Sequence, residues 1–408
     1  MRDLIVIGGG AAGLMCAVTA ARRGLSVTLL EPQRILGRKL RITGKGRCNV
    51  TNACDIKTFM QNIPGDGRFL YSAMSRFGTG EVMAFFEELG VPLKVERGSR
   101  VFPVSDNAND IADALARECE RLGVEILRES ARSIRTQGGA VCAVTTERGE
   151  LPCRAAAICT GGLSYPKTGS TGAGHRMARE LGHSVTPLRP SLVPLESSDA
   201  YCAEMQGFSL RNVTLSAYED EKLIFRELGE MLFTHFGVSG PLVLSASAKM
   251  RRMGSARYRL AIDLKPALDE KKLEARILRD IEASPRQSCH SLLGGLAGRS
   301  MVPVLEQLTE IPAEQRCTDF TRAQRQRLIQ VLKAFPIEIC GTRPIDEAIV
   351  TAGGVSTKEL DPRTMESKLV KGLYLAGEVL DLDAYTGGFN LQIAWCTGHL
   401  AGMSVPEA

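Results

Sequence analysis

The sequence lacks the features that would place it in several large protein classes. Its 12 cysteines include no C-x-x-C pair, which excludes a zinc ribbon and a thioredoxin-like pair. Its five histidines form no H-x-E or H-x-x-x-H array, so we expect no metal site. No apolar stretch reaches the roughly 18 residues of a membrane helix, and no membrane span is expected.

Aromatic residues and net charge are also low. Aromatics make up 5% of the chain, and the net charge is +5 over 408 residues. A dedicated nucleic-acid-binding protein carries a stronger basic excess, so nucleic acid is not the expected partner. Many unpaired thiols suit a reducing compartment, and we expect the cytoplasm. The apolar fraction of 44% is ample for a core, and the length predicts one large or two to three ordinary domains.

A glycine-rich turn follows the first apolar segment of the chain. Residues 4–7 predict a strand, and residues 14–23 predict a helix. Between them lies G-x-G-x-x-G, and a second apolar strand over residues 26–30 ends on Glu31, about 20 positions after the motif. This is the dinucleotide-binding fingerprint in the structural setting that it requires.

Each glycine of the motif has a separate physical task. Gly8 permits a tight turn, Gly10 lets the backbone approach a pyrophosphate, and Gly13 allows close packing of helix on strand. The amides of Ala11 and Ala12, at the positive end of the helix dipole, then face the phosphates.

Glu31 narrows the choice of nucleotide. Its carboxylate can accept hydrogen bonds from a ribose diol and would repel a 2′-phosphate, so we do not expect the nucleotide bound here to be NADP. The motif alone leaves NAD and FAD open.

The next part of the chain favours FAD. Residues 131–136, 140–148 and 151–154 predict a small antiparallel meander, and residues 155–159 predict a return strand that ends at Thr160 and Gly161. This order is typical of FAD domains of the glutathione-reductase type, whereas simple NAD dehydrogenases lack the meander.

The C-terminal segment adds a second argument for FAD. Residues 372–378 predict a strand ending in Gly377 and Glu378, an acid placed to bind the ribityl chain. Residues 385–392 lead into a helix whose N-terminus would stabilise negative charge at the flavin N1 and O2 edge. The cofactor-binding residues expected there are Gly388, Phe389, Asn390 and Leu391.

Residues 37–52 predict an irregular loop that is rich in glycine and cations. Its five cations have no acid among them and are Arg38, Lys39, Arg41, Lys45 and Arg47. We expect contact with the FAD pyrophosphate and flavin edge, chiefly from Arg38 and Lys39; a solvated basic loop and contact with RNA are the alternatives. Further cofactor-binding residues expected in this loop are Gly46, Arg47, Cys48 and Asn49, with Cys48 as a packed cysteine rather than a redox thiol.

The pattern predicts a discontinuous α/β protein. Residues 1–190 and 351–408 form the FAD-binding Rossmann-type domain. Residues 191–265 and 336–350 predict an inserted β-barrel-like domain, and residues 266–335 a small helical subdomain. The oligomeric state cannot be predicted from these patterns.

Several long motifs resemble a known family. RKLRITGKGRCNVTN (38–52), TGGLSYPKTGSTGAGH (160–175), TAGGVS (351–356), TMESK (364–368) and GLYLAGEVLDLDAYTGGFNLQIAW (372–395) are similar to the BaiN/YhiN-type flavoproteins, also labelled aminoacetone oxidase family FAD-binding enzymes. The resemblance implies an FAD domain with an inserted barrel and a helical subdomain, and the subdomain boundaries given above rest partly on it. It also implies that the backbone at Ala131 pairs with the adenine.

The resemblance further implies FAD-dependent redox chemistry. The expected reaction is reduction of an apolar enone, such as a 3-oxo-Δ4 steroid or bile-acid intermediate, by hydride transfer from flavin N5. A flavin amine oxidase of the aminoacetone type and an FAD-bearing RNA-modifying protein are the alternatives.

Catalytic residues stay unassigned by the sequence. Tyr165, His175 and Tyr385 are candidate proton donors, because each lies in a glycine-rich segment beside a predicted flavin-binding segment. No second G-x-G-x-x-G is present, so NAD(P)H would dock transiently at the flavin as hydride donor.

Overall fold

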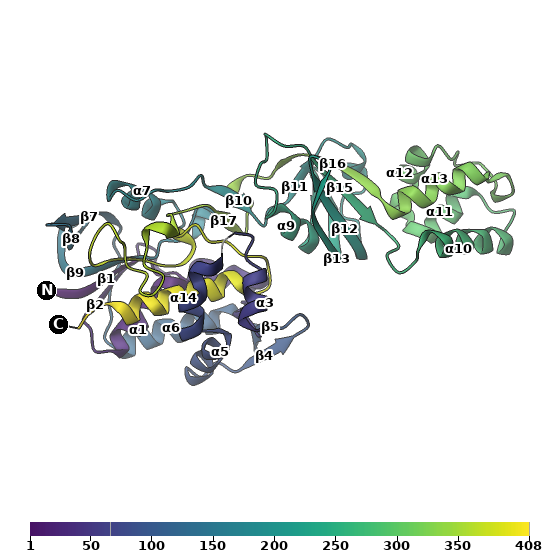
Figure 1. The fold of residues 1–408 in the computed structure, drawn as a ribbon. Coiled ribbons are helices and arrows are strands. Elements are labelled where there is room, and N and C mark those ends of the chain that lie inside the picture. Colours follow the sequence, from purple (N-terminus) through teal and green to yellow (C-terminus); the bar gives the residue numbers. More distant parts are fainter. Residues whose placement is uncertain (66, 408) are drawn as a thin grey trace. The chain divides into compact units, whose positions relative to one another are not determined.

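The computed structural model describes residues 1–65 and 67–407, which form two compact units (Figure 1). The first unit comprises Met1–Ser191 and Ile345–Ala408, and the second comprises Leu192–Pro344. Residues 345–350, which the sequence pattern placed in the barrel-like part, therefore lie in the first unit. Among the described helices, none is long and apolar enough to cross a membrane.

A seven-stranded sheet forms the centre of the first unit. Its parallel strands are β6 (Glu125–Leu127), β2 (Val27–Leu30), β1 (Arg2–Ile7), β9 (Glu150–Ile158) and β18 (Leu373–Leu375), and β8 (Ala140–Thr146) and β7 (Ala131–Gln137) add an antiparallel meander. Strands β2 and β18 are buried throughout, and β1 and β9 are buried over their last four residues, which explains the apolar runs there.

Strand β9 belongs to both parts of this sheet. Its first residues pair antiparallel with β8, and its last pair parallel with β1 and β18, so that Ile158 lies between Ile7 and Leu375. The sequence pattern predicted a third meander strand and a separate return strand here. The structure joins them because no residue of this stretch interrupts the extended backbone.

Two helices from opposite ends of the chain pack together in the first unit. Figure 1 shows α14 (Phe389–Ser404) beside α1 (Ala11–Arg22). A Cβ on Gly398 would overlap the carbonyl oxygen of Ala12, and one on Gly402 would lie 2.6 Å from that of Cys16. Because both contacts advance by four residues on each helix, the helices run parallel at very close range.

The remaining elements of the first unit surround the seven-stranded sheet and the α1–α14 pair. They are α2 (Arg38–Gly46), α3 (Ile56–Gln61), α4 (Tyr71–Arg76), α5 (Thr79–Glu88), α6 (Ala108–Arg121), α7 (Ala173–Glu180), a small sheet of β3 (Thr51–Asn52), β5 (Arg100–Pro103) and β4 (Leu93–Glu96), and a two-strand ladder of β10 (Arg189–Ser191) and β17 (Val350–Ala352). The expected irregular loop over residues 37–52 thus begins as a helix. Its helical geometry ends at Thr43, and Gly44 and Lys45 adopt positive φ angles.

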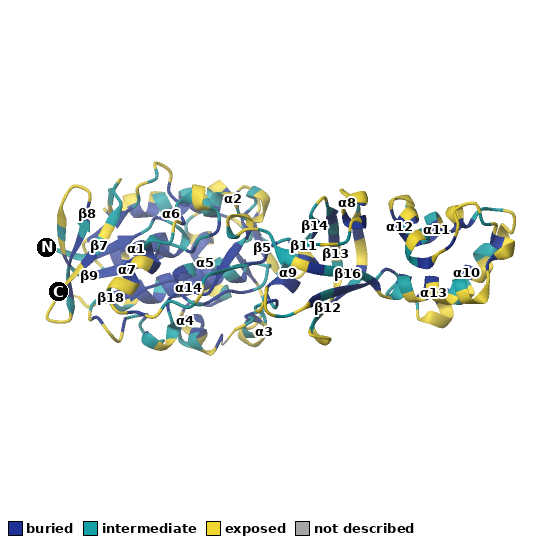
Figure 2. Ribbon diagram, turned by 90° about the horizontal axis from the view of Figure 1, so that it is seen from above, coloured by how far each residue is buried: buried dark blue, intermediate teal, exposed yellow. Residues whose placement is uncertain are grey.

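The second unit is a closed barrel with helices. The barrel strands are β11 (Leu195–Ser197), β14 (Gly237–Ser239), β13 (Lys222–Thr234), β12 (Ser209–Glu219), β15 (Tyr258–Asp263) and β16 (Phe335–Thr342), and the helices are α8 (Tyr201–Glu204), α9 (Pro241–Ser247), α10 (Glu270–Ala283), α11 (Cys289–Ala297), α12 (Val302–Thr309) and α13 (Arg322–Lys333). One hydrophobic core runs through barrel and helices and includes Phe233, Phe335 and Leu328. Figure 2 shows buried residues on both the barrel strands and the helices of this unit. The predicted α/β class, with a Rossmann-type domain and an inserted barrel, is confirmed.

The contact between α1 and α14 makes a prediction about stability. Gly398→Ala should lower the free energy of unfolding by about 1–3 kcal/mol, because the added methyl group forces the two helices apart. Chemical denaturation measures the change. Gly80→Ala in α5 is the matched control: a Cβ there meets no atom within 4 Å, so stability should hold or rise slightly. Equal losses in both variants would contradict the assignment of this contact.

Candidate functional site

The three motif glycines in the turn between β1 and α1 have different surroundings. Gly8 has φ +106°, and a Cβ there would lie 2.6 Å from the carbonyl oxygen of Cys159. A Cβ on Gly13 would overlap the carbonyl oxygen of Gly8. A Cβ on Gly10, in contrast, meets no protein atom within 4 Å. Two glycines therefore serve the packing of the turn, and the third faces open space at the helix N-terminus.

Glu31 is fixed directly beside this turn. Its Oε2 accepts a hydrogen bond of 2.8 Å from the Gly9 amide, and its Oε1 accepts one of 2.8 Å from the Gln33 amide. The Glu31 amide in turn donates to the Leu127 carbonyl oxygen, four residues before Ala131 begins β7. The acid is thus held at the end of β2 with further lone pairs available for a ribose diol.

A second polar cluster joins four segments that are far apart in the sequence. The Lys39 ammonium group donates to Glu378 Oε2 at 2.6 Å and to Ser164 Oγ at 2.7 Å. Ser164 Oγ donates to Glu378 Oε1 at 3.0 Å, and the Thr351 amide donates to the same oxygen at 2.9 Å. Lys39 and Glu378 were predicted site residues, whereas Ser164 and Thr351 were not.

The Lys39–Glu378 pair is largely shielded from water. Each side chain is about one-fifth exposed, at 22% and 21%. Burial by itself would raise the pKa of Glu378, but the charge and hydrogen bond of Lys39, together with the hydrogen bonds from Thr351 and Ser164, outweigh it and hold that pKa below its ordinary value. Glu378 is therefore ionised at neutral pH.

The N-terminus of α14 is bound to the segment that follows α2. Asn49 Oδ1, in the amide orientation that satisfies its neighbours, accepts from the Gly388 amide at 3.0 Å. Thr51 Oγ1 donates to Gln392 at 2.6 Å, and Asn52 Nδ2 donates to the Gly387 carbonyl oxygen at 3.0 Å. Two motifs separated by more than 300 residues thus form one scaffold around this helix end.

The other predicted residues of α14 have separate tasks. Asn390 Nδ2 donates to the Ala384 carbonyl oxygen at 2.7 Å, and Oδ1 accepts from the Ala384 amide, so Asn390 holds the preceding loop. Phe389 is buried against Phe59, and Leu391 is partly exposed. The first amides of α14 have no partner within the helix, as at every helix start.

The two helix N-termini fit the two ends of an FAD molecule. In the parallel packing Ala12 faces Gly398, so α14 extends about eight residues, roughly 12 Å, beyond the start of α1 in the same direction. A Cβ on Gly377 would lie 2.7 Å from the Cβ of Ala12, which places Glu378 next to this frame. The open side of Gly10 would hold the pyrophosphate, and the start of α14 would hold the flavin edge.

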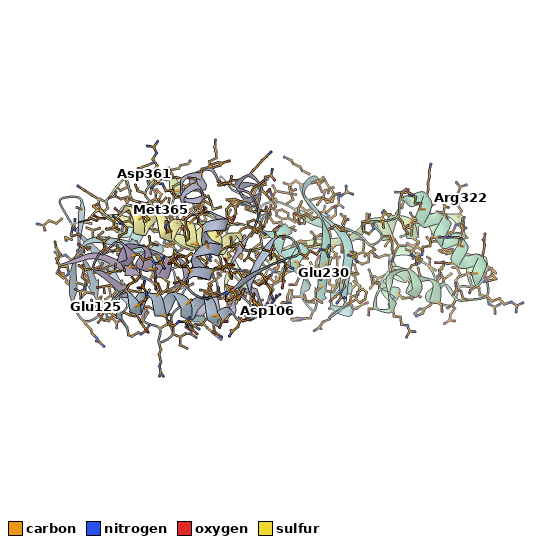
Figure 3. All side chains as sticks on the ribbon, turned by 90° about the horizontal axis from the view of Figure 1, so that it is seen from below. Asp106, Glu125, Glu230, Arg322, Asp361 and Met365 are labelled. Carbon is orange, nitrogen blue, oxygen red and sulfur yellow. The ribbon has the colours of Figure 1, made fainter. Side chains whose placement is uncertain are left out.

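Some predicted cofactor residues have protein partners in this structure. Arg47 lies over the ring of Phe102 and forms ion pairs with Glu96 and with Asp106, which is labelled in Figure 3. Its side chain is thereby held at β4 and β5. Arg41, one of the five cations, forms a similar pair with Asp113 of α6.

Arg38 and Cys48 differ sharply in exposure. Arg38 is exposed and donates to the side chain of Gln33, whose amide is bonded to Glu31. Cys48 is completely buried, and burial raises the pKa of its thiol to about 12. The Cys48 thiol is therefore protonated at neutral pH. Gly46 follows the bend at Gly44 and Lys45 with φ +83°.

The loop after β9 lies beside the Glu378 cluster. Gly161 has φ +71°, and a Cβ on Gly162 would lie 2.9 Å from Glu378 Oε1. Thr160 packs against Gly174 at the start of α7. His175 is 1% exposed, and burial lowers its pKa, so its imidazole is neutral at physiological pH. Tyr165 and Tyr385 are partly exposed.

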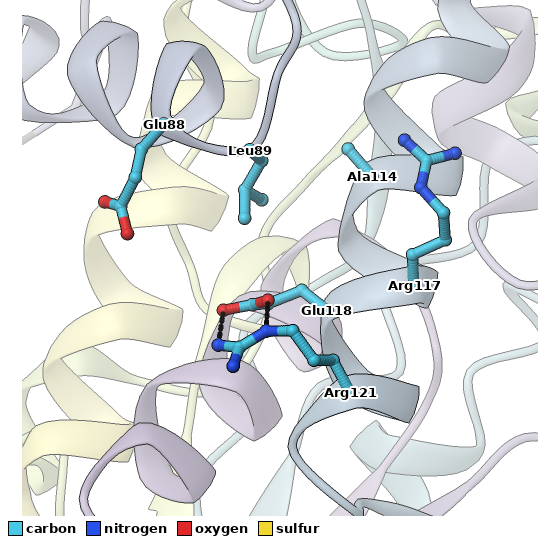
Figure 4. Close-up of a pocket in the computed structure, with 6 residues that line it drawn as sticks. All are labelled: Glu88, Leu89, Ala114, Arg117, Glu118 and Arg121. Atoms are coloured by element: carbon cyan, nitrogen blue, oxygen red, sulfur yellow. Dashed lines mark hydrogen bonds and ion pairs between the residues drawn. The ribbon is translucent and has the colours of Figure 1, made fainter.

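A small surface hollow of about 280 Å³ lies elsewhere in the first unit (Figure 4). It is lined by Glu88, Leu89, Ala114, Arg117, Glu118 and Arg121. Hydrogen bonds from Arg121 and Arg22 outweigh burial and lower the pKa of Glu118. None of the predicted cofactor residues lines this hollow, so it is not part of the candidate site.

Because a Cβ on Gly10 would meet no protein atom, we expect a substitution there to weaken FAD binding without destabilising the apoprotein. Gly10→Ala should change apoprotein stability by less than about 1 kcal/mol, because Gly10 already has a φ of −86° that alanine adopts. FAD affinity should fall by at least about tenfold, because the methyl group occupies the pyrophosphate position. Thermal unfolding and titration by flavin fluorescence measure the two effects.

Gly13→Ala is the contrasting variant for this test. Its added methyl group overlaps the Gly8 carbonyl oxygen, so the apoprotein itself should be destabilised. Unchanged FAD binding in the Gly10 variant would contradict the pyrophosphate assignment.

The Lys39–Glu378 pair predicts a pH dependence. A carboxyl group whose pKa is lowered in the folded state stabilises the fold at neutral pH, and this contribution is lost as pH falls through the lowered pKa. Lys39→Met should cost roughly 3 kcal/mol at neutral pH and should move the acid-side loss of stability to higher pH, because burial, which raises the pKa of Glu378, is then opposed only by the hydrogen bonds from Thr351 and Ser164.

Denaturation at a series of pH values measures this shift. The double variant Lys39→Met, Glu378→Gln removes the unpaired charge and should recover part of the stability. An acid limb at the same pH in the wild type and in Lys39→Met would contradict the role of Lys39.

Comparison with known proteins identifies the family of this chain. The family model described as "HI0933-like protein Rossmann domain" matches residues 2–404. The 3-dehydro-bile acid delta(4,6)-reductase of Clostridium scindens is 32% identical over the full length of both chains. The ribosomal RNA dihydrouridine synthase of Haemophilus influenzae is 31% identical over 98% of both chains.

A solved structure shares the fold at low identity. The 3-ketosteroid delta1-dehydrogenase of Sterolibacterium denitrificans aligns over 99% of both chains with a TM-score of 0.53 and 12% identity. The family model and the two full-length relatives together show that this chain belongs to the HI0933-like family of Rossmann-domain flavoproteins.

Proposed function

We propose that this chain, an FAD-dependent oxidoreductase, saturates a carbon–carbon double bond conjugated to a carbonyl group in an apolar substrate such as a 3-oxo steroid. A hydride adds to the β-carbon and a proton to the α-carbon. FAD, once bound and reduced, supplies the hydride from its N5 position. NAD(P)H is the proposed electron source and is oxidised to NAD(P)⁺.

The parallel α1–α14 frame is the observation that carries this proposal. Gly10 and the first amides of α1 would bind the pyrophosphate, and Glu31 would bind the adenosine ribose. Ionised Glu378, paired with Lys39, would accept hydrogen bonds from ribityl hydroxyls. The amides at the start of α14 would hold the N1 and O2 edge, where a positive helix end stabilises negative charge.

Two partly exposed tyrosines are the candidate proton donors for the α-carbon. Tyr165 follows Ser164 of the Glu378 cluster and holds a strained φ of +52°. Tyr385 lies in the loop that Asn390 fixes before α14. A tyrosine hydroxyl group is one of the side chains that act as general acids, whereas His175 is neutral and 1% exposed and therefore lacks access to a substrate.

The names of the two curated relatives support this reaction type. The Clostridium scindens protein is named for a 3-dehydro-bile acid delta(4,6) reduction. The Haemophilus influenzae protein is named for dihydrouridine formation in ribosomal RNA. In both names the bond that is saturated is conjugated to a carbonyl group. The second name makes a uracil ring in RNA the second candidate substrate for this chain.

The proposed function predicts two separable half-reactions. Under anaerobic conditions, NADH or NADPH should bleach the flavin absorbance of the purified holoprotein, and a 3-oxo-Δ4 steroid should restore it. Mass spectrometry should then find a product with two additional hydrogen atoms. Unmodified ribosomal RNA is the parallel substrate, and dihydrouridine in the digested RNA would assign the second candidate instead.

Reduction of the flavin by an amine substrate in place of NAD(P)H would contradict the proposal. If aminoacetone bleached the flavin and neither nicotinamide did, the chain would be an amine oxidase. Saturated substrate analogues are the matched control, because they carry the carbonyl group without the double bond and should not reoxidise the flavin.

A further inference from the structure

The two-strand ladder of β10 and β17 lies at both points where the chain passes between its units. β10 ends at Ser191, directly before the second unit begins at Leu192. The chain returns to the first unit at Ile345 and soon forms β17 (Val350–Ala352). The ladder pairs Ser191 with Val350 and Arg189 with Ala352.

The β17 strand of this ladder is bonded directly to the Glu378 cluster. Thr351 is completely buried, and its amide donates to Glu378 Oε1 at 2.9 Å. Its hydroxyl oxygen accepts from the amides of Leu163 at 2.8 Å and Ser164 at 3.2 Å. One residue thus fixes the acid and also the loop that carries the Ser164 hydroxyl.

The β10 strand is bonded to the loop before α14. Ser191 is 1% exposed, and its hydroxyl group donates to Asp383 Oδ2 at 2.8 Å. Asp383 is 4% exposed and is followed by Ala384, whose backbone Asn390 holds. The ladder therefore contacts both segments that the proposed function assigns to the flavin side of the cofactor.

Backbone strain coincides with the end of β10. Leu192 has φ +55°, an unusual conformation for a bulky residue, and it is 1% exposed. Such a conformation persists only where the surrounding structure determines it. The Ser191–Asp383 bond fixes the residue directly before it.

We propose that Thr351 and Ser191 are positioning residues through which the β10–β17 ladder fixes Glu378 and the loop before α14 against the bound flavin. Thr351 acts on the Glu378 carboxylate directly through its amide, and indirectly through its hydroxyl, which holds the amide of Ser164 beside the same carboxylate. Ser191 acts through Asp383. The connections to the inserted unit thereby become part of the cofactor site. This inference rests on the assignment of FAD to the site but not on the identity of the substrate.

Thr351→Val tests the first half of the proposal at the hydroxyl group. Valine keeps the shape and the backbone amide that bonds Glu378, but it removes the acceptor for the amides of Leu163 and Ser164, and so frees the loop whose Ser164 hydroxyl bonds Glu378. We expect FAD affinity to fall by about tenfold and the visible flavin spectrum to shift. Thr351→Ser, which keeps the hydroxyl group, should restore both. With Glu378→Gln as background, Thr351→Val should add little, since it acts through Glu378.

Thr186→Val is the matched control. Thr186 Oγ1 accepts from the Gly354 amide at 3.0 Å close to the same ladder in sequence, but it makes no contact with Glu378. A purely structural role for Thr351 predicts that both valine variants lower the melting temperature while the flavin spectrum and FAD affinity stay unchanged. That result would overturn the proposal.

Ser191→Ala keeps the proposal testable if Thr351→Val does not fold, because it leaves no backbone amide unpaired. We expect a shifted flavin spectrum and a lower FAD affinity in this variant as well. Wild-type values for both would overturn the role of the ladder. If the wild-type protein did not bind FAD at all, the cofactor assignment itself would be wrong. The failure of the ladder proposal and the failure of the FAD assignment are therefore distinguishable.

Discussion

The frame of the first unit depends on the contact of two helix backbones at Gly398 and Gly402. No other residue type allows this approach, because a Cβ at either position would meet a carbonyl oxygen of α1. The contact makes α1 and α14 parallel and fixes their offset. It thereby places two positive helix ends, one from each end of the chain, at a separation that suits the phosphate and ring ends of one dinucleotide. The Gly377–Ala12 contact adds the third segment to this frame.

The shielded carboxylate of Glu378 is the second constraint on the first unit. Glu378 loses hydration on folding, and an unpaired carboxylate in that position would cost several kcal/mol. Lys39, Ser164 and the Thr351 amide together replace the lost water, so four separate segments must meet around one carboxyl group. The same reasoning explains the neighbouring cations: Arg41 and Arg47 each have acidic partners elsewhere. Their positions in one basic segment therefore do not imply one common ligand.

The sequence predicted what depends on local pattern. The glycine turn, the apolar strands, the alternation of β and α and the inserted barrel all follow from short-range periodicity and turn residues. The extent of β9 and the helical start of residues 38–42 were missed, because continuity of an extended strand and packing of α2 on α6 depend on tertiary neighbours. Ser164 and Thr351 were also missed. A serine and a threonine carry no positional signal until the fold brings them to a buried acid.

The inserted unit has a hydrophobic core of its own, separate from the residues proposed to hold the cofactor. Phe233, Phe335 and Leu328 belong to one hydrophobic cluster within the second unit, whereas every residue proposed to hold FAD lies in the first. Residues of the barrel and its helices can therefore be substituted without disturbing the α1–α14 pair, as long as β10 and β17 keep their bonds to Asp383 and Glu378. The narrow ladder is then the element that must stay constant, because a change there acts on both cofactor-side loops at once.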